Sequence, residues 1–269
     1  MAFAEIDPNA LMRLIGSPDA PVVIDLRLPE DLAADSMRVP TSLCLSASEV
    51  PGPAAGWRGR HVVVVCLRGR KISQGAAALL RLDGVRAEVL TGGTEGWRAA
   101  GLPLVPAKWA APAGLWVTRH RPKVDRIACP WLIRRFVDPA ARFLFVPPGD
   151  VLAVAEKFGA TPFDIEGVFW THRELGGVGG CTFDTMLAEF GLSTPALDRL
   201  ALVIRAADTD RHDLAPQAAG LLALSVGLSR AYRDDLEQLA AAMPLYDALY
   251  RWARDGSDEG HDWPAGRKS

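Results

Sequence analysis

Cysteine is scarce in this chain, with four residues in 269. They stand far apart, at Cys44, Cys66, Cys129 and Cys181. This number and this scatter do not suit the disulfide framework of a small secreted domain. We therefore expect thiols or metal ligands in a reducing compartment.

Long apolar runs and a charge excess are also missing. No apolar segment approaches the roughly 20 residues that span a bilayer. Residues 1–8 lack the basic start and the apolar core of a signal peptide, so we expect a cytoplasmic protein without a membrane partner. The net charge is −2 and the isoelectric point is near 6.2. Without a basic excess, we expect no nucleic-acid partner.

One segment concentrates the chemistry that is present. Residues 62–65 are consecutive valines, a β-branched run that is typical of a parallel strand covered on both faces. Cys66 follows at the carboxyl end of this strand, then comes a short basic loop, and residues 73–82 have a helical pattern. We expect backbone N–H groups of the loop and of the first helical turn to converge on whatever group Cys66 carries.

This setting favours a thiolate at Cys66. The helix dipole and the side chains of Arg68, Arg70 and Lys71 all stabilise an anion, and this lowers the pKa of a thiol and makes it nucleophilic. The alternative is a structural cysteine that packs as a small hydrophobe at the end of a strand.

The flanking segments extend this pattern. Strands are predicted at residues 21–27 and 87–90, and helical segments are predicted to follow them at 29–35 and within 91–103. Strands that alternate with helices predict an α/β domain with a central parallel sheet flanked by helices. The site of such a domain lies beyond the carboxyl ends of its strands.

Three motifs carry a family resemblance: Val-Ile-Asp-Leu-Arg at 23–27, Cys-Leu-Arg-Gly-Arg-Lys at 66–71 and Leu-Thr-Gly-Gly-Thr-Glu-Gly-Trp at 90–97. With these motifs, residues 1–106 resemble a single rhodanese-like domain. The resemblance implies a sulfurtransferase that needs no cofactor. Cys66 would take sulfur from a small anionic donor such as thiosulfate and pass it to a thiol or protein acceptor.

The resemblance also implies the roles of individual residues. Cys66 is the catalytic residue and opens an anion-binding loop. The other loop residues are Leu67, Arg68, Gly69, Arg70, Lys71 and Ile72. Leu67 and Arg68 stand where many relatives have a polar and then a small residue, which leaves the choice of donor open. Asp25 and Arg27 are expected to support the site as a structural ion pair or turn.

A second domain is expected to follow the first. Prolines, alanines and glycines interrupt any periodic pattern near residues 101–114, so we place a linker at 107–115. A strand is predicted at 141–146 and another within 163–170. Helices are predicted at 149–158, 182–190, 194–207, 215–229 and 232–254, so residues 116–254 form a mainly helical α+β domain. Residues 255–269 form a polar tail. A chain of this length is long enough for two domains with separate cores.

Polar clusters in this second half offer metal ligands. Imidazole, carboxylate and thiol groups from separate segments are the residue types of a transition-metal site. The candidate ligands are Asp125, Cys129, His172, Cys181, Asp208, Asp210 and His212. Asp125 and Cys129 stand four residues apart and share a face if their segment is helical. The alternatives are helix capping and surface charge for the carboxylates and core packing for the thiols.

Three segments of this half, residues 118–135, 181–184 and 207–220, resemble the C-terminal domain of the ChrB family of chromate resistance proteins. The resemblance implies a link to chromate resistance, and it makes chromate and a transition metal of unknown identity the candidate ligands of this domain. A rhodanese-like domain stands in place of the usual N-terminal region of these regulators, and this argues against regulation by DNA binding.

Three readings remain open at this point. In the first, Cys66 relays sulfur as an enzyme while the second domain binds an acceptor or a metal centre. In the second, the cationic loop captures an oxyanion such as chromate, and the protein is a non-catalytic sensor, redox sensor or regulatory protein. A redox-stress interaction protein with an inactive rhodanese fold is a third reading. The sequence does not predict the oligomeric state.

Overall fold

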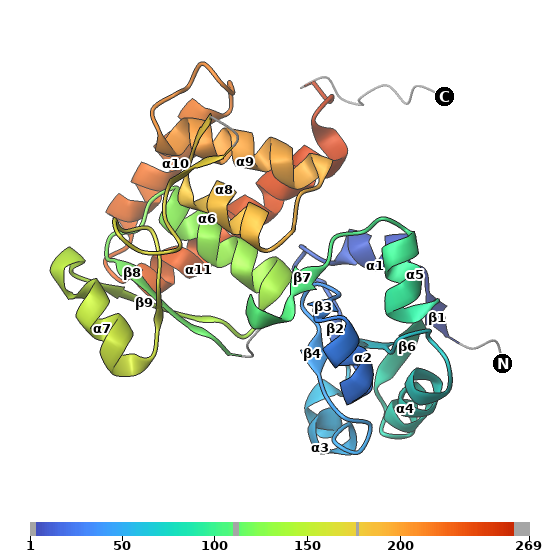
Figure 1. Ribbon diagram of the computed structural model, residues 1–269. Helices are drawn as coiled ribbons and strands as arrows, with labels where there is room; N and C mark the ends of the chain where they lie inside the picture. The colour runs from blue at the N-terminus through green and yellow to red at the C-terminus, as the bar shows by residue number, and fades with distance from the viewer. Residues whose placement is uncertain (1–3, 110–112, 176–177, 261–269) are drawn as a thin grey trace.

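The computed structural model describes residues 4–109, 113–175 and 178–260, and it has a sheet-based first half and a mainly helical second half (Figure 1). The valine run forms β5 (His61–Val65) at the centre of a parallel sheet. The strand order is β1-β6-β5-β2-β4. The other strands are β1 (Glu5–Ile6), β2 (Val22–Asp25), β4 (Leu43–Cys44) and β6 (Arg86–Leu90). The predicted buried parallel strand is confirmed.

Helices cover both faces of this sheet. Val62 and Val64 of β5 pack in one cluster with Leu80 of α4 (Lys71–Leu82), and Ala54 of α3 (Pro51–Ala54) joins them. The opposite face, with Val63, packs toward α1 (Pro8–Leu14) and α5 (Gly93–Ala99). The remaining elements of this half are α2 (Pro29–Ala34) and an antiparallel pair of short strands, β3 (Met37–Arg38) and β7 (Val105–Pro106).

The second half combines a small parallel sheet with a group of helices. Its sheet has the order β10-β8-β9 and contains β8 (Leu115–Arg119), β9 (Arg142–Val146) and β10 (Thr161–Pro162). A separate antiparallel hairpin consists of β11 (Arg173–Leu175) and β12 (Val178–Gly180). The helices are α6 (Asp125–Leu132), α7 (Val151–Phe158), α8 (Thr182–Glu189), α9 (Pro195–Asp208), α10 (Ala218–Ala231) and α11 (Asp235–Arg251).

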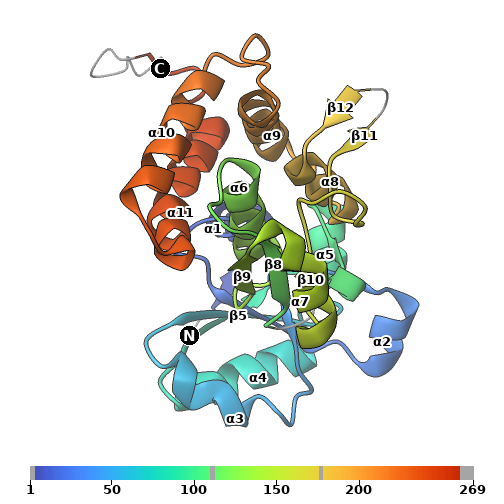
Figure 2. The ribbon, with the colours of Figure 1, turned by 90° about the vertical axis from the view of Figure 1, so that its left-hand side faces the viewer.

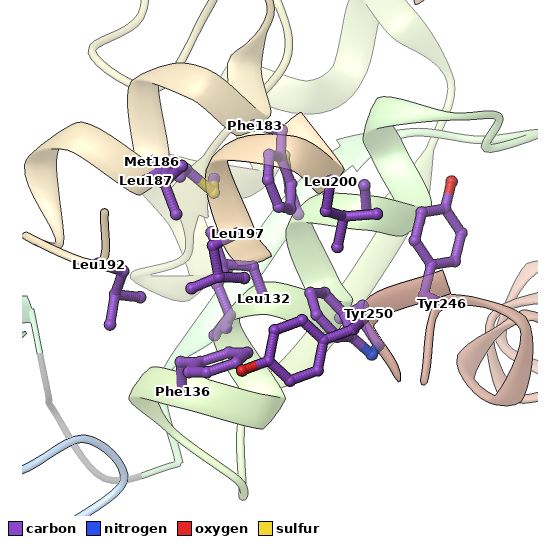
Figure 3. Packing of buried hydrophobic residues seen from close by; sticks show 14 of the residues in the cluster. Leu132, Phe136, Phe183, Met186, Leu187, Leu192, Leu197, Leu200, Tyr246 and Tyr250 are labelled. Atoms are coloured by element: carbon purple, nitrogen blue, oxygen red, sulfur yellow. The ribbon is translucent and has the colours of Figure 1, made fainter. Parts of the chain in front are cut away.

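Helix α6 lies at the centre of the helical group (Figure 2). All but one of its residues are buried, and α8, α9 and α11 contact it. Leu132 at its carboxyl end packs with side chains from these helices and from the π-helical turn Ile133–Val137 that follows α6 (Figure 3). A helix that is apolar around most of its circumference must be buried in this way. Asp125 is therefore carried into the interior at the first turn of α6.

The two halves share one continuous hydrophobic core, which differs from the expectation of separate cores. Val63 of β5 belongs to the same buried cluster as Phe136 and Tyr250 of the second half. The approach is close, because a Cβ added to Gly16 would lie 2.3 Å from the ring of Phe136. The backbone N–H of Thr41 also donates to the carbonyl oxygen of Phe136 at 3.1 Å. The physical reason is that the segments around Gly16 and Thr41 of the first half pack directly against Phe136 of the second half.

Several boundaries differ from those predicted. Residues 163–170 form no regular strand, and their sheet pairing is a single bridge between Phe163 and Trp170. The sequence did not predict β8. It left α6 undecided, because a proline at position 130 lies inside this helix. Part of the expected linker, residues 110–112, and the tail from 261 onward lie outside the described residues. Within the described ranges no helix is both long and apolar enough to cross a membrane.

Candidate functional site

Cys66 lies directly after the last residue of β5 and just before α4. The residue is 7% exposed, and its Sγ lies 3.1 Å from the hydroxyl oxygen of Ser73 in the first turn of α4. Because β5 is the central strand, its carboxyl end delivers the thiol to the edge of the sheet where strand ends and helix starts meet.

The conformation of the loop after Cys66 depends on close backbone contact with Gly93 at the start of α5. Gly69 has φ +65° and Gly93 has φ +59°, and a Cβ at Gly93 would lie 2.1 Å from the carbonyl oxygen of Cys66. The N–H groups of Thr94 and Glu95 donate to the carbonyl oxygens of Cys66 and Leu67, each at 3.0 Å. These bonds turn the first two loop carbonyls toward α5, which leaves loop N–H groups to face the thiol.

The surroundings of Cys66 favour its thiolate. Burial alone would raise the pKa of the thiol, but the hydrogen bond with Ser73 and backbone hydrogen bonds from Arg70, Arg68 and Ser73 outweigh it and place the pKa below its ordinary value. The amino end of α4 adds its positive dipole. A thiol with a lowered pKa is the reactive kind of cysteine.

The charged residues of the loop have different environments. Arg68 pairs with Glu95 at 3.1 Å, and both side chains are exposed. Arg70 and Lys71 are exposed at the start of α4, whereas Ile72 packs against the core on the α4 side of the sheet. Arg70 and Lys71 therefore place exposed positive charge at the amino end of α4.

Asp25 and Arg27 form a buried ion pair. Their closest contact, from Nη2 of Arg27 to Oδ2 of Asp25, is 2.8 Å, and both side chains are almost fully buried. Arg27 also donates to the carbonyl oxygens of Asp35 at 3.0 Å and Met37 at 2.8 Å. These contacts fasten the segment after β2 to the chain before β3, so the pair supports the fold beside the Cys66 loop.

Ser73 is a site residue that the sequence did not predict. Its hydroxyl lies 2.9 Å from the carbonyl oxygen of Arg70 as well as 3.1 Å from the sulfur of Cys66. The signal for it was a hydroxyl in the first turn of the helix that follows the loop, where such side chains face exposed backbone groups.

Replacing Ser73 with alanine should raise the pKa of Cys66, because the hydrogen bond that stabilises the thiolate is lost while burial remains. The measurement is the rate of Cys66 alkylation by iodoacetamide as a function of pH, whose midpoint we expect to move upward. Gln74→Ala, one residue further along α4, is the control and should leave the midpoint in place. An unchanged midpoint in Ser73→Ala would contradict this role.

A second group of ionisable residues meets inside the helical half. Nε2 of His172 lies 3.5 Å from an Asp125 oxygen and 3.3 Å from oxygens of both Asp164 and Asp208. Asp125 is 1% exposed and His172 has a side chain 45% exposed. We call Asp125, Asp164, His172 and Asp208 the His172 cluster.

Hydrogen bonds from neighbouring residues hold two carboxylates of the His172 cluster in place. Asp125 accepts hydrogen bonds from the N–H groups of Thr182 at 2.6 Å and Phe183 at 3.1 Å, at the start of α8. Asp164 accepts one from the Thr182 hydroxyl at 2.9 Å and another from Arg119 at 3.0 Å. The amino end of α8 therefore fixes the orientation of both carboxylates.

The residues of the His172 cluster shift one another's pKa values. Burial, reinforced by Asp208 and Asp164, raises the pKa of Asp125 to about 6. Hydrogen bonding to Asp125, Asp164 and Asp208 raises the pKa of His172 to about 12. Burial would also raise the pKa of Asp164, but hydrogen bonds from His172 and Thr182 hold it below its ordinary value. The carboxyl groups of three aspartates thus surround a single imidazole.

The structure brings together only some of the predicted metal ligands. Cys129 lies one turn after Asp125 on α6, with its Sγ 3.9 Å from the carboxylate, so the shared face is confirmed. Burial raises the pKa of both Cys129 and Cys181 well above the ordinary value, as expected of core thiols. Asp210 and His212 lie outside the His172 cluster and face each other at 3.8 Å near the surface.

Asp164 is the member of the cluster that the sequence did not predict. It follows Phe163 after β10 and has φ +54°, a conformation that aspartate tolerates better than most residues. The available signal was a lone aspartate after a strand pattern, which is too common to identify a site without the fold.

Comparisons with known proteins place both halves in families. Residues 7–100 match the rhodanese-like domain, and residues 116–253 match the C-terminal domain of ChrB. Protein ChrB of Cupriavidus metallidurans is 36% identical over 137 residues, which cover 50% of this chain and 39% of that protein. A sulfurtransferase of Allochromatium vinosum is 29% identical over 106 residues, which cover 38% of this chain and 94% of that protein.

Solved structures also resemble the first half. A rhodanese-related protein from Thermoplasma volcanium is 24% identical with a TM-score of 0.33, and the match covers 38% of this chain and 98% of that one. A thiosulfate sulfurtransferase from Pseudomonas aeruginosa is 24% identical with a TM-score of 0.34, covering 39% of this chain and 20% of that one. The chain belongs to the ChrB C-terminal domain family, and it carries that domain behind a rhodanese-like domain.

Proposed function

We propose that this protein is a sulfurtransferase in which Cys66 carries the sulfur as a persulfide. The observation that supports this most is the thiol at the end of β5, whose pKa is lowered by Ser73 and by backbone groups of the loop despite its burial. A sulfurtransferase needs a nucleophilic thiolate and a cradle for the sulfur that it receives. The sulfurtransferase relative supports the same reading.

The proposed reaction has two displacement steps. The Cys66 thiolate attacks the outer sulfur of thiosulfate, an S–S bond forms at Cys66, and sulfite leaves with the electron pair of the broken bond. A nucleophilic acceptor such as cyanide or a thiolate then attacks the outer sulfur of the persulfide and regenerates the Cys66 thiolate. The loop N–H groups stabilise the negative charge on sulfur in both states.

Exposed cations are assigned to the capture of the donor. Arg70 and Lys71 stand at the start of α4, beside Cys66 in the chain. They attract an anionic donor electrostatically, and added salt weakens this attraction. Arg68 is engaged by Glu95 and is assigned to holding the loop against α5.

The test is a steady-state assay of the full chain with thiosulfate and cyanide, in which thiocyanate is measured. We expect turnover with ping-pong kinetics, because the enzyme holds the sulfur between the two displacements. The value of kcat/KM for thiosulfate should fall as salt is added. Absence of thiocyanate above the uncatalysed rate, with thiosulfate and with an organic persulfide donor, would contradict the proposal.

The second candidate function is capture of an oxyanion without turnover. It is favoured by the match of the second half to the ChrB C-terminal domain, because resemblance to the ChrB family implies a link to chromate resistance. In this case chromate would bind the loop amides in place of a sulfur anion. Chromate binding that is equally tight in the wild type and in Cys66→Ser, combined with no sulfur transfer, would favour this function over the first.

A further inference from the structure

Four separate segments supply the His172 cluster. Asp125 begins α6, Asp164 follows β10, His172 precedes β11, and Asp208 ends α9. One ligand atom from each of Asp125, Asp164 and His172 lies within 4.8 Å of the others. The helical half thus converges on this point from widely spaced parts of the chain.

Ion pairing does not account for this arrangement. Nε2 of an imidazole carries at most one proton and can donate one good hydrogen bond, yet oxygens of three carboxylates lie 3.3 to 3.5 Å from it. Arg119 and Arg126 form ion pairs with Asp164, at 3.0 and 3.3 Å. Asp125, which is buried, and Asp208 therefore still face one shared imidazole.

The spacing instead suits ligands of one ion. Four ligand atoms that each lie about 2.1 Å from a metal in a tetrahedral arrangement are about 3.4 Å from one another. The three contacts of His172 Nε2, at 3.5, 3.3 and 3.3 Å, agree with that separation. The ligand atoms of Asp125, Asp164 and His172 also lie within 4.8 Å of one another, and Asp208 stands outside this group of three and contacts His172.

The carboxylate oxygens have capacity for such an ion. The oxygens of Asp125 and Asp164 that face His172 each accept one hydrogen bond from Thr182, and a carboxylate oxygen has a second lone pair for a metal. Hydrogen bonds of this kind, from the protein to the ligating groups, are what fixes ligand orientation in metal sites.

A cavity lies beside His172, the one member of the cluster that lines it. It has a volume of about 560 Å³, and His172 lies in its wall with Arg173, Arg205 and Thr209. The His172 side chain is partly exposed on this side, whereas Asp125 is buried.

We propose that Asp125, Asp164, His172 and Asp208 bind a divalent first-row transition metal. Oxygen ligands with one imidazole suit Mn²⁺, Fe²⁺ or Zn²⁺ better than a soft ion such as Cu⁺. The thiol of Cys129 stands behind Asp125 and is not in the ligand set. This site is separate from Cys66 and does not depend on the sulfur-transfer proposal.

The test uses the full chain, stripped of metal with a chelator, and Mn²⁺ as the probe. The electron paramagnetic resonance signal of hydrated Mn²⁺ reports the unbound ion during a titration, and elemental analysis after gel filtration counts the bound ion. We expect one Mn²⁺ per chain. His172→Gln should weaken binding by at least about tenfold, and His172 is exposed enough for this variant to fold, as its circular dichroism should confirm.

Matched controls come from the neighbouring residues outside the cluster. His212→Gln should bind Mn²⁺ as the wild type does, and Asp208→Asn should weaken binding while Asp210→Asn does not. Cys66→Ser should also bind normally. Equal affinity in the wild type and His172→Gln, or no saturable binding at a large excess of Mn²⁺, would overturn the proposal.

Discussion

Replacing Cys66 with serine should abolish transfer of sulfur from thiosulfate to cyanide. The hydroxyl of serine is not ionised at neutral pH and cannot hold sulfur as a persulfide, so both displacement steps are lost. We expect kcat/KM to fall by at least about a thousandfold, as it does when an essential nucleophile is removed from an enzyme. The fold should persist, because the change is nearly isosteric.

Cys44 provides the control for this variant. It lies at the end of β4 in the same sheet, half-buried, and burial together with Asp25 raises the pKa of its thiol. Cys44→Ser should therefore leave the activity close to that of the wild type. Full activity in Cys66→Ser, or an equal loss in both variants, would show that the thiol of Cys66 is not the sulfur carrier.

Replacing Gly93 with alanine should disrupt the Cys66 loop and destabilise the first half. The new Cβ would lie 2.1 Å from the carbonyl oxygen of Cys66 and 2.6 Å from the nitrogen of Gly69, which are backbone atoms that cannot rotate away. Positive φ at this position adds strain for any residue with a side chain. Together these effects should cost more than about 3 kcal/mol in the free energy of unfolding, as measured by urea denaturation.

Gly75→Ala is the matched control for Gly93→Ala. Gly75 lies inside α4, and an added Cβ meets no atom within 4 Å. Alanine there should stabilise the protein by up to about 1 kcal/mol, because glycine is a poor helix former. If Gly93→Ala were as stable as Gly75→Ala and kept its sulfurtransferase activity, the loop would not depend on its contact with α5.

Local sequence patterns predicted the Cys66 site well because its main parts are contiguous. The valine run, the thiol and the start of α4 lie within about 20 residues, and strand and helix periodicities report directly on such segments. The contribution of Gly93 is different. It acts through contact with the carbonyl oxygen of Cys66, 27 positions earlier in the chain, and only the motif resemblance pointed to it.

The His172 cluster could be predicted only in part because it is assembled by tertiary packing. Asp208 and Asp210 look equivalent in the sequence, but α9 ends at Asp208, and Asp210 has φ +56°, which turns the chain away from the cluster. Asp164 carries no local signal at all. Side chains from distant segments meet according to how the helices pack, and periodicity does not contain that information.

The core shared by the two halves also could not be predicted from the sequence. A segment rich in prolines and alanines suggested a linker between independent domains, because such composition breaks secondary structure. Composition does not report whether the flanking surfaces are apolar enough to pack. Val63 and Phe136 lie in one buried cluster, so the rhodanese-like and ChrB-type halves are physically joined, and strain in one half can be transmitted to the other.

The most direct test of the central claim is the intact mass of the protein after treatment with thiosulfate and gel filtration. We expect the wild type to gain one sulfur atom, about 32 Da, which peptide mapping locates on Cys66 and cyanide removes. No gain of mass, or a gain that persists in Cys66→Ser, would contradict a persulfide at this thiol.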